Sequence, residues 1–233
     1  VNRGGTFHDV TLQWTDVLAR TRGRYLDMGD VGALGTRRLF ARLRDRSGSE
    51  TKAPRKLDYR YNYALSGARC ASLGSSGWPD QTRWLVSAID AAPEQWADGI
   101  VVIRIGVNDL GQRRHLDQYA RTGITESDRA VIASCVREMT RAVERIRAAS
   151  PSIRIVVVGV ADDSSWPPAS SPWRSPDDVA RIRSVLDLFD QSVRDAVSGP
   201  GVAFMDDRAW YYEHWADRDS TGNAQLSGRS LGG

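Results

Sequence analysis

The chain has 233 residues, of which 41% are hydrophobic, and this length and composition fit one domain with a sizeable core. The net charge is +3, and arginine supplies nearly all of the positive charge because lysine occurs only at Lys52 and Lys56. Acidic residues are interspersed along the chain, so it lacks the concentrated basic stripe that nucleic-acid binding needs. No apolar run approaches the roughly 20 residues that span a bilayer, so no membrane span is expected.

Two cysteines, Cys70 and Cys135, are too few for a disulfide framework or a zinc site. We expect each to be a small buried apolar residue, with a single bridge between them as the alternative. The chain opens at Val1 without Met or a signal peptide and closes on a Gly-rich segment at Gly233. We interpret both ends as cut, and neither localisation nor oligomeric state is predicted from them.

The first predicted element is an amphipathic helix of about three turns, with apolar residues at i, i+4, i+7 and i+8 from Val10 and Asp9 as its cap. A short helix over 36–43 follows among glycine-rich loops. Residues 57–65 alternate between apolar and polar, which is typical of a strand, and they end in Ser66-Gly67-Ala68.

The rest of the chain alternates between helix and strand. The predicted elements are a helix over 80–91, a strand over 100–105, a helix over 126–149, a strand over 153–160, a helix over 176–197 and a strand over 201–206. Polar loops are expected at 112–115 and 166–172. This alternation predicts a three-layer α/β/α sandwich with a mostly parallel, flavodoxin-like sheet. We expect a single domain over 1–233, incomplete at both termini.

The strand over 100–105 ends in Gly106-Val107-Asn108-Asp109. Its near-continuous Val and Ile run predicts a strand buried on both faces, and ligands of parallel sheets bind outside the carboxyl ends of the strands. Gly106 permits a tight turn, and the Asn108 amide can donate two hydrogen bonds into a cleft. This strand end is therefore a candidate site, with an ordinary turn as the alternative.

Together, the segments Asn62-Tyr63-Ala64-Leu65-Ser66-Gly67-Ala68 and Gly106-Val107-Asn108-Asp109 resemble the second and third sequence blocks of the SGNH hydrolases, the GDSL-type esterases and lipases. The resemblance implies that the Gly67 amide and the Asn108 side chain are oxyanion-hole donors, and that Asp109 supports the loop. A turn glycine at Gly67 and a helix cap or Asx-turn at Asn108 are the alternatives.

Two other blocks of that family are missing. The nucleophile block Gly-Asp-Ser does not occur, since Gly29-Asp30-Val31 has Val in the place of Ser. The closing Asp-x-x-His block is also absent, because the only downstream histidine, His214, lacks an Asp three residues earlier. We expect the Ser before Val1 and the base beyond Gly233, so the chain alone is predicted to be inactive. His8 and His115 are interpreted as surface histidines, and the alternatives place His8 at the edge of the site and His115 at its entrance.

The predicted function is carboxylic ester hydrolysis by acyl transfer, which needs no metal and no organic cofactor. The predicted substrate is a small-molecule, carbohydrate or lipid ester. A non-catalytic carbohydrate-binding module on the same fold is the alternative, suggested by the loop tryptophans Trp78, Trp166 and Trp173. A flavodoxin-like nucleotide or phosphate binder is a third possibility, but no Gly-rich phosphate loop follows a strand.

Overall fold

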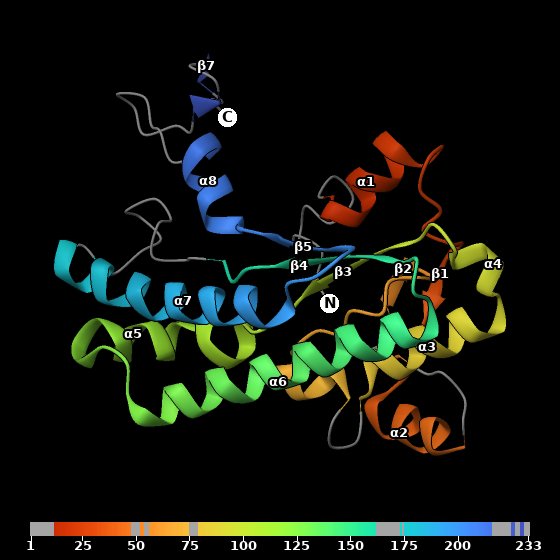
Figure 1. The fold of residues 1–233 in the computed structure, drawn as a ribbon, viewed down its shortest axis with the longest axis horizontal. Helices are drawn as coiled ribbons and strands as arrows, with labels where there is room; N and C mark the ends of the chain where they lie inside the picture. The colour runs from red at the N-terminus through yellow and green to blue at the C-terminus, as the bar shows by residue number, and fades with distance from the viewer. Residues whose placement is uncertain are drawn as a thin grey trace.

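The computed structural model describes residues 12–47, 52–53, 56–74, 79–161, 173, 175–215, 225–226 and 229–230. At its centre lies a parallel three-stranded sheet in the order β3–β4–β5, formed by Ile100–Arg104, Arg154–Val158 and Val202–Met205 (Figure 1). Within the described residues, no helix is both long and apolar enough to cross a membrane.

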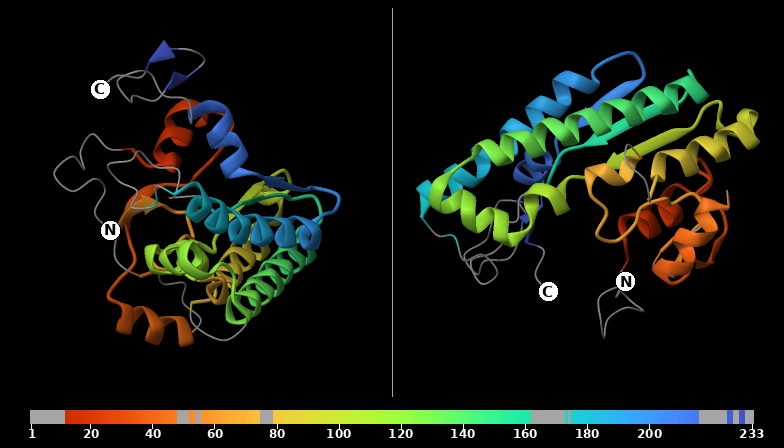
Figure 2. Two further views of the ribbon diagram at one scale, coloured as in Figure 1. Left: turned by 90° about the vertical axis from the view of Figure 1, so that its left-hand side faces the viewer. Right: turned by 90° about the horizontal axis from the view of Figure 1, so that it is seen from below.

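Two long helices connect the strands of this sheet. Helix α6 (Glu126–Ala149) joins β3 to β4, and α7 (Pro176–Val197) joins β4 to β5. Because the strand order advances in one direction and such crossovers are right-handed, both helices lie on the same face of the sheet, as Figure 2 shows. Helix α3 (Gln81–Ala91) packs against α6, and α5 (Arg113–Thr122) packs against α7. The predicted βαβ alternation is therefore confirmed for this half of the chain.

The core lies between the sheet and these helices. Strand β4 is the central strand and contributes Ile155 and Val157, which are 1% and 0% exposed. The buried stripe of α6 repeats at the spacing of a helix face, and it consists of Ile132, Cys135, Met139, Ala142, Val143 and Ile146. The other face of β3 is open, because Ile100 and Val102 are 42% and 41% exposed. The expectation that β3 is buried on both faces was therefore wrong in the described structure.

Strands β1 (Val31–Leu34) and β2 (Lys56–Tyr59) form a separate antiparallel pair, with α2 (Arg38–Arg46) between them in sequence. The prediction of one long strand over 57–65 was wrong, because the chain turns after Tyr59, whose carbonyl accepts the Asn62 N–H at 3.1 Å. Lys52 holds this turn, as its Nζ donates to the carbonyls of Arg60, at 2.8 Å, and of Asn62.

Local signals set most helix ends. Helix α6 has the predicted bounds, and its cap Thr125 accepts the Asp128 N–H. Helix α7 begins at Pro176 as predicted, directly after Ser175. Pro93, expected to end α3, also opens the short helix α4 (Pro93–Trp96). The polar loop expected at 112–115 is instead the start of α5, because the chain has already turned in the segment before it.

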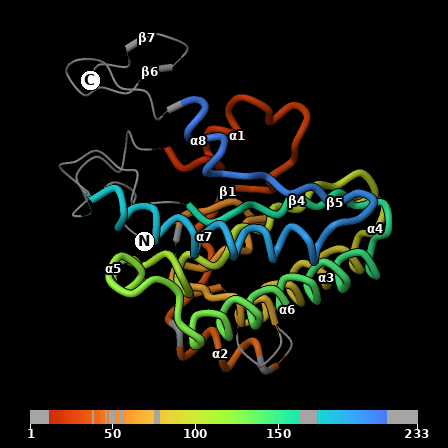
Figure 3. The backbone as a smooth tube through the Cα atoms, turned by 60° about the vertical axis from the view of Figure 1, so that its left-hand side comes forward, coloured from red at the N-terminus to blue at the C-terminus, as the bar shows by residue number. Residues whose placement is uncertain are grey.

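Helix α1 (Trp14–Arg22) departs from its prediction. It begins after Gln13, and Val10 and Asp9 lie outside the described residues. Its apolar residues Trp14 and Val17 are 51% and 44% exposed, so the expected inward apolar face was wrong. Figures 1 and 3 show α1 and α2 on opposite sides of the sheet. Helix α8 (Asp207–Trp215) follows β5, and a two-stranded pair, β6 (Gln225–Leu226) and β7 (Arg229–Ser230), comes later in the chain.

Candidate functional site

The segment after β3 forms a single π-helical turn, η3 (Val107–Gly111), which carries Asn108 and Asp109. Gly106 starts it with a φ of 109°, in the left-handed region. A Cβ on Gly106 would lie 2.9 Å from Phe189 Cζ and 3.2 Å from a methyl of Val160, so both the backbone and the packing require glycine. Single π turns are frequent at functional sites.

The Asn108 side chain joins the two sequence blocks. Its Nδ2 donates to the Ala68 carbonyl at 2.8 Å, across 40 positions of sequence. Its Oδ1 accepts from Gln112 Nε2 at 3.1 Å, which fixes the orientation of the amide. An Asn amide has two hydrogens, so the bond to Ala68 leaves one more to donate. The loop after β2 and the end of β3 therefore meet, although their strands belong to different sheets.

Gly67 immediately precedes Ala68 in a turn closed by the Ala68 N–H and the Leu65 carbonyl at 3.1 Å. Its φ is 75°, and a Cβ there would meet nothing within 4 Å, so the conformation and not the packing selects glycine. Gly67 is exposed, and its N–H has no acceptor among the described residues. A backbone donor that has no acceptor in the described part of the chain thus lies one residue from the carbonyl that Asn108 binds.

Asp109 holds the neighbouring loop through its carboxylate. Its Oδ2 accepts the Cys70 N–H at 3.0 Å, and Cys70 opens the short 3-10 helix η2 (Cys70–Leu73). Burial raises the pKa of Asp109, against the opposing effects of the Cys70 N–H and the Arg69 charge. The loop that contains Gly67 is therefore tied to η3 at two points, Asn108 and Asp109.

Cys70 and Cys135 form a disulfide with an S–S distance of 2.01 Å, which joins η2 to α6. The preferred interpretation of two separate buried thiols was wrong, and the alternative of one bridge was right. The two sulfurs lie close to the Asp109 carboxylate, but disulfide sulfurs are not thiolates and this trio does not suit a metal ion. The spacing of 65 residues gave no signal for the pairing.

The structure places two of the three histidines. His115 lies in α5, where burial and the neighbouring Arg114 lower its pKa. His214 lies in α8, where its ring stacks on Trp210 with centroids 5.0 Å apart and its Nδ1 is 2.9 Å from the Trp210 carbonyl. Among the described contacts, none joins either ring to Asn108 or Asp109 by a hydrogen bond. His8 lies outside the described residues.

Of the three loop tryptophans, only Trp173 lies in the described part of the chain. Its Nε1 donates to Asp117 Oδ1 at 3.0 Å, and its ring packs against the core. Trp173 is therefore held against α5. Trp78 and Trp166 lie outside the described residues.

A buried acidic residue next to η3 was missed in the sequence. Asp190 on α7 is 2% exposed, and its Oδ1 accepts the Val160 N–H at 3.0 Å. Its Oδ2 is 2.9 Å from Arg208 Nη2. Burial raises the pKa of Asp190 to about 6, although the Arg208 charge and the Val160 N–H favour the carboxylate. Asp190 thus holds the end of β4, where Val160 packs against Gly106.

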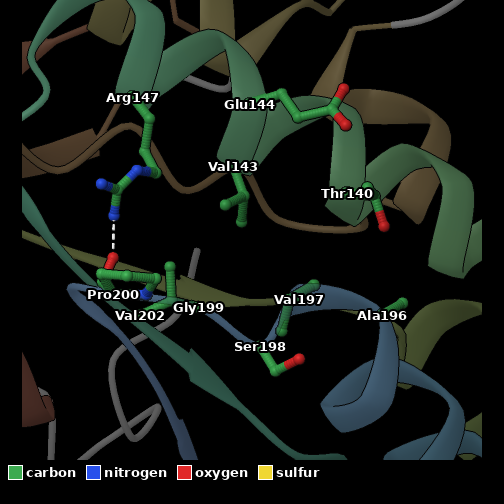
Figure 4. Close-up of a pocket in the computed structure, with 10 residues that line it drawn as sticks. All are labelled: Thr140, Val143, Glu144, Arg147, Ala196, Val197, Ser198, Gly199, Pro200 and Val202. Atoms are coloured by element: carbon green, nitrogen blue, oxygen red, sulfur yellow. Dashed lines mark hydrogen bonds between the residues drawn. The ribbon is translucent and has the colours of Figure 1, made fainter.

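A cavity of about 300 Å³ lies elsewhere, between the end of α6 and the start of β5 (Figure 4). Its lining includes Glu144, Arg147 and Val202, and Arg147 Nη1 donates to the Pro200 carbonyl. Val202 opens β5, so this cavity is at the amino end of that strand, whereas Asn108 follows the carboxyl end of β3. The cavity is therefore separate from the candidate site.

Polar loops at the carboxyl ends of parallel strands are the usual site of α/β enzymes. The family model of the GDSL-like Lipase/Acylhydrolase family matches residues 14–228. The match covers most of the chain, so the chain belongs to this family, whose general activity is ester hydrolysis. A search of curated proteins found no match.

Proposed function

We propose that this chain provides the oxyanion hole of an SGNH-type carboxylic ester hydrolase. The observation that supports it best is the 2.8 Å hydrogen bond from Asn108 Nδ2 to the Ala68 carbonyl. It brings the Asn108 amide to the loop of Gly67, whose N–H has no acceptor among the described residues. Two fixed donors can then face one oxygen. Such donors are each worth about 2.7–4 kcal/mol when they stabilise a developing oxyanion.

In the proposed reaction, a serine hydroxyl attacks the ester carbonyl while a histidine takes its proton. The carbonyl oxygen becomes negatively charged in the tetrahedral intermediate, where the Gly67 N–H and the Asn108 amide donate to it. When the intermediate collapses, the protonated histidine gives its proton to the leaving oxygen, the alcohol departs, and water then hydrolyses the acyl-enzyme. Asp109 supports the loop by accepting the Cys70 N–H.

The Gly-Asp-Ser and Asp-x-x-His blocks do not occur in these 233 residues. The proposal therefore takes the nucleophile and the base from outside them, with His214 as a weaker candidate for the base, and these residues alone are expected to be inactive. The proposed fold is one domain with a flavodoxin-like three-layer sandwich. The proposed substrate is a small-molecule, carbohydrate or lipid ester, and the reaction needs no metal or organic cofactor. The anchored Trp173 does not favour the rival carbohydrate-binding module.

The test measures p-nitrophenyl acetate hydrolysis by the gene product translated from its own start codon. Asn108→Ala is expected to lower kcat by about 10²–10³, the usual loss when one oxyanion donor is removed. Gln191→Ala is the matched control, because Gln191 is an exposed amide side chain on α7 that donates to Asp195 on the same helix. It is expected to retain kcat within a few-fold per folded molecule.

Two outcomes contradict the proposal. Equal kcat for the wild type and Asn108→Ala excludes an oxyanion role for Asn108. Turnover by the 233-residue chain alone that disappears in Asn108→Ala shows that a nucleophile lies within these residues, contrary to the proposal.

A further inference from the structure

Helix α2 presents its apolar residues to solvent, the reverse of an ordinary surface helix. Leu39, Phe40 and Leu43 are 69%, 55% and 52% exposed, whereas Ala41 is fully buried. Figures 1 and 3 show α2 at the outer edge of the molecule, on the side away from α1. Single exposed hydrophobic residues are common on protein surfaces and need no explanation. Three large apolar side chains on one exposed helix face do need one.

Their order around the helix is regular. At about 100° per residue, Leu39, Leu43 and Phe40 cover an arc of roughly 100°. Arg42 and Arg44 flank this arc, each about 100° from Leu43. Ala41 and Asp45 lie on the opposite side, about 160° from Leu43. The helix therefore has an apolar outer stripe, an arginine on each border and a small inner face.

Side-chain contacts hold α2 in this orientation. Asp45 Oδ1 accepts from Trp84 Nε1 at 2.7 Å and from Arg83 Nη2 at 2.5 Å, both on α3. Trp84 is 1% exposed, so this anchor is part of the packed core. Rotation of α2 to bury its leucines would break these bonds and leave the buried indole N–H without its acceptor. The outward apolar stripe is therefore fixed by the fold.

We propose that α2 docks the protein on an anionic lipid surface. Interfacial helices bury an apolar stripe at the headgroup boundary while basic side chains reach the headgroups. Asp45 is the acidic residue of α2, and it faces inward. A layer of anionic headgroups offers negative charge to Arg42 and Arg44 at the same time, although they lie on opposite borders of the apolar stripe. A second copy of the chain fits poorly, because symmetric pairing of α2 would bring like-charged arginines together.

This inference does not depend on ester hydrolysis, and the experiment measures binding alone. The full chain is sedimented with vesicles of equal parts phosphatidylglycerol and phosphatidylcholine, and with vesicles of phosphatidylcholine only. We expect preferential binding to the anionic vesicles, weakened by added salt. Leu39→Gln/Leu43→Gln and Arg42→Gln/Arg44→Gln are each expected to weaken it by roughly 10-fold or more.

Two double variants serve as matched controls. Leu12→Gln/Val17→Gln alters similarly exposed apolar residues beside and on α1, on the other side of the sheet. Arg129→Gln/Arg137→Gln removes two exposed arginines from α6. Both are expected to bind anionic vesicles within a few-fold of the wild type. Circular dichroism and thermal unfolding confirm that every variant is folded.

Several results would overturn the proposal. The proposal is wrong if the chain does not bind the anionic vesicles or binds both vesicle types equally. It is also wrong if the two α2 variants bind the anionic vesicles as the wild type does. Self-association that Leu39→Gln/Leu43→Gln abolishes in analytical ultracentrifugation, without vesicle binding, would assign the stripe to a second copy. Binding of an acidic protein partner without vesicle binding would likewise refute a lipid surface.

Discussion

The burial and the raised pKa of Asp190 both result from how elements pack around the candidate site. It is 2% exposed and joins α7 to the end of β4 through the Val160 N–H. Its second neighbour, Arg208, also pairs with Asp187 at 2.6 Å. Nothing near Asp190 in the sequence marks it as buried, because Val160 lies 30 positions away. Its raised pKa of about 6 is therefore a property of the fold.

The stability of the protein is predicted to depend on pH through Asp190. In the native state the Asp190 carboxyl keeps its proton up to about pH 6, whereas an unfolded Asp carboxyl loses its proton near pH 3.9. Between about pH 3.9 and about pH 6 the native state therefore binds more protons than the unfolded state, so the unfolding free energy falls as the pH rises. The total loss is about 3 kcal/mol, because each unit of pKa difference corresponds to about 1.36 kcal/mol. Urea unfolding at pH 4 to 7 should show this loss in the wild type relative to Asp190→Asn.

Asp187→Asn is the control, since Asp187 contacts the same arginine but its side chain is 67% exposed. It should lose stability with rising pH as the wild type does. Identical pH profiles for Asp190→Asn and the wild type would rule out the Asp190 contribution.

At the scale of elements, the disulfide fixes η2 to α6 beside the candidate oxyanion loop. Cys70 also donates its N–H to Asp109, so the bridge and the hydrogen bond support the same loop. The amphipathic periods of α3, α6 and α7 and the start of α7 at Pro176 could be predicted, because these signals are local. The short pair β1–β2 and the start of α5 could not, because turns and contacts distant in sequence override local pattern there.

Removing the bridge by Cys70→Ala/Cys135→Ala is predicted to lower the unfolding free energy by about 2–5 kcal/mol, mainly because the unfolded chain gains freedom. Urea unfolding of the wild type and the variant under non-reducing conditions measures the difference. Iodoacetamide labelling of the denatured wild type, without reductant, should modify no cysteine. A labelled thiol in the wild type, or unchanged stability in the variant, would contradict this assignment.

For the whole molecule, the sheet topology predicts an order of local stability. Strand β4 pairs on both sides, with β3 and β5, and its Ile155 N–H donates to the Gly201 carbonyl at 2.8 Å. The β1–β2 pair is short, and its residues Val31 and Leu57 are 54% and 57% exposed. Amides buried in the core open only with the whole fold, whereas exposed pairs open locally.

Hydrogen exchange followed by mass spectrometry or NMR should therefore show the slowest exchange in β4 and markedly faster exchange in β1 and β2. Helix α6 serves as the internal reference, because its inner face is packed into the same core as β4. Equal protection of β2 and β4 would mean that the two sheets unfold as one unit, against the prediction.

The sequence by itself determined the alternation of helices and parallel strands, because the periodicities of buried side chains are set by local backbone geometry. It also indicated Asn108 and Asp109 as candidate site residues at the end of a strand, whereas Gly67 was indicated by the family resemblance. Only the tertiary structure decided that Asn108 binds the Ala68 carbonyl, that the cysteines are bonded and that α2 faces outward. Each of these depends on groups about 40 or more positions apart, and their contact is decided by how whole elements pack.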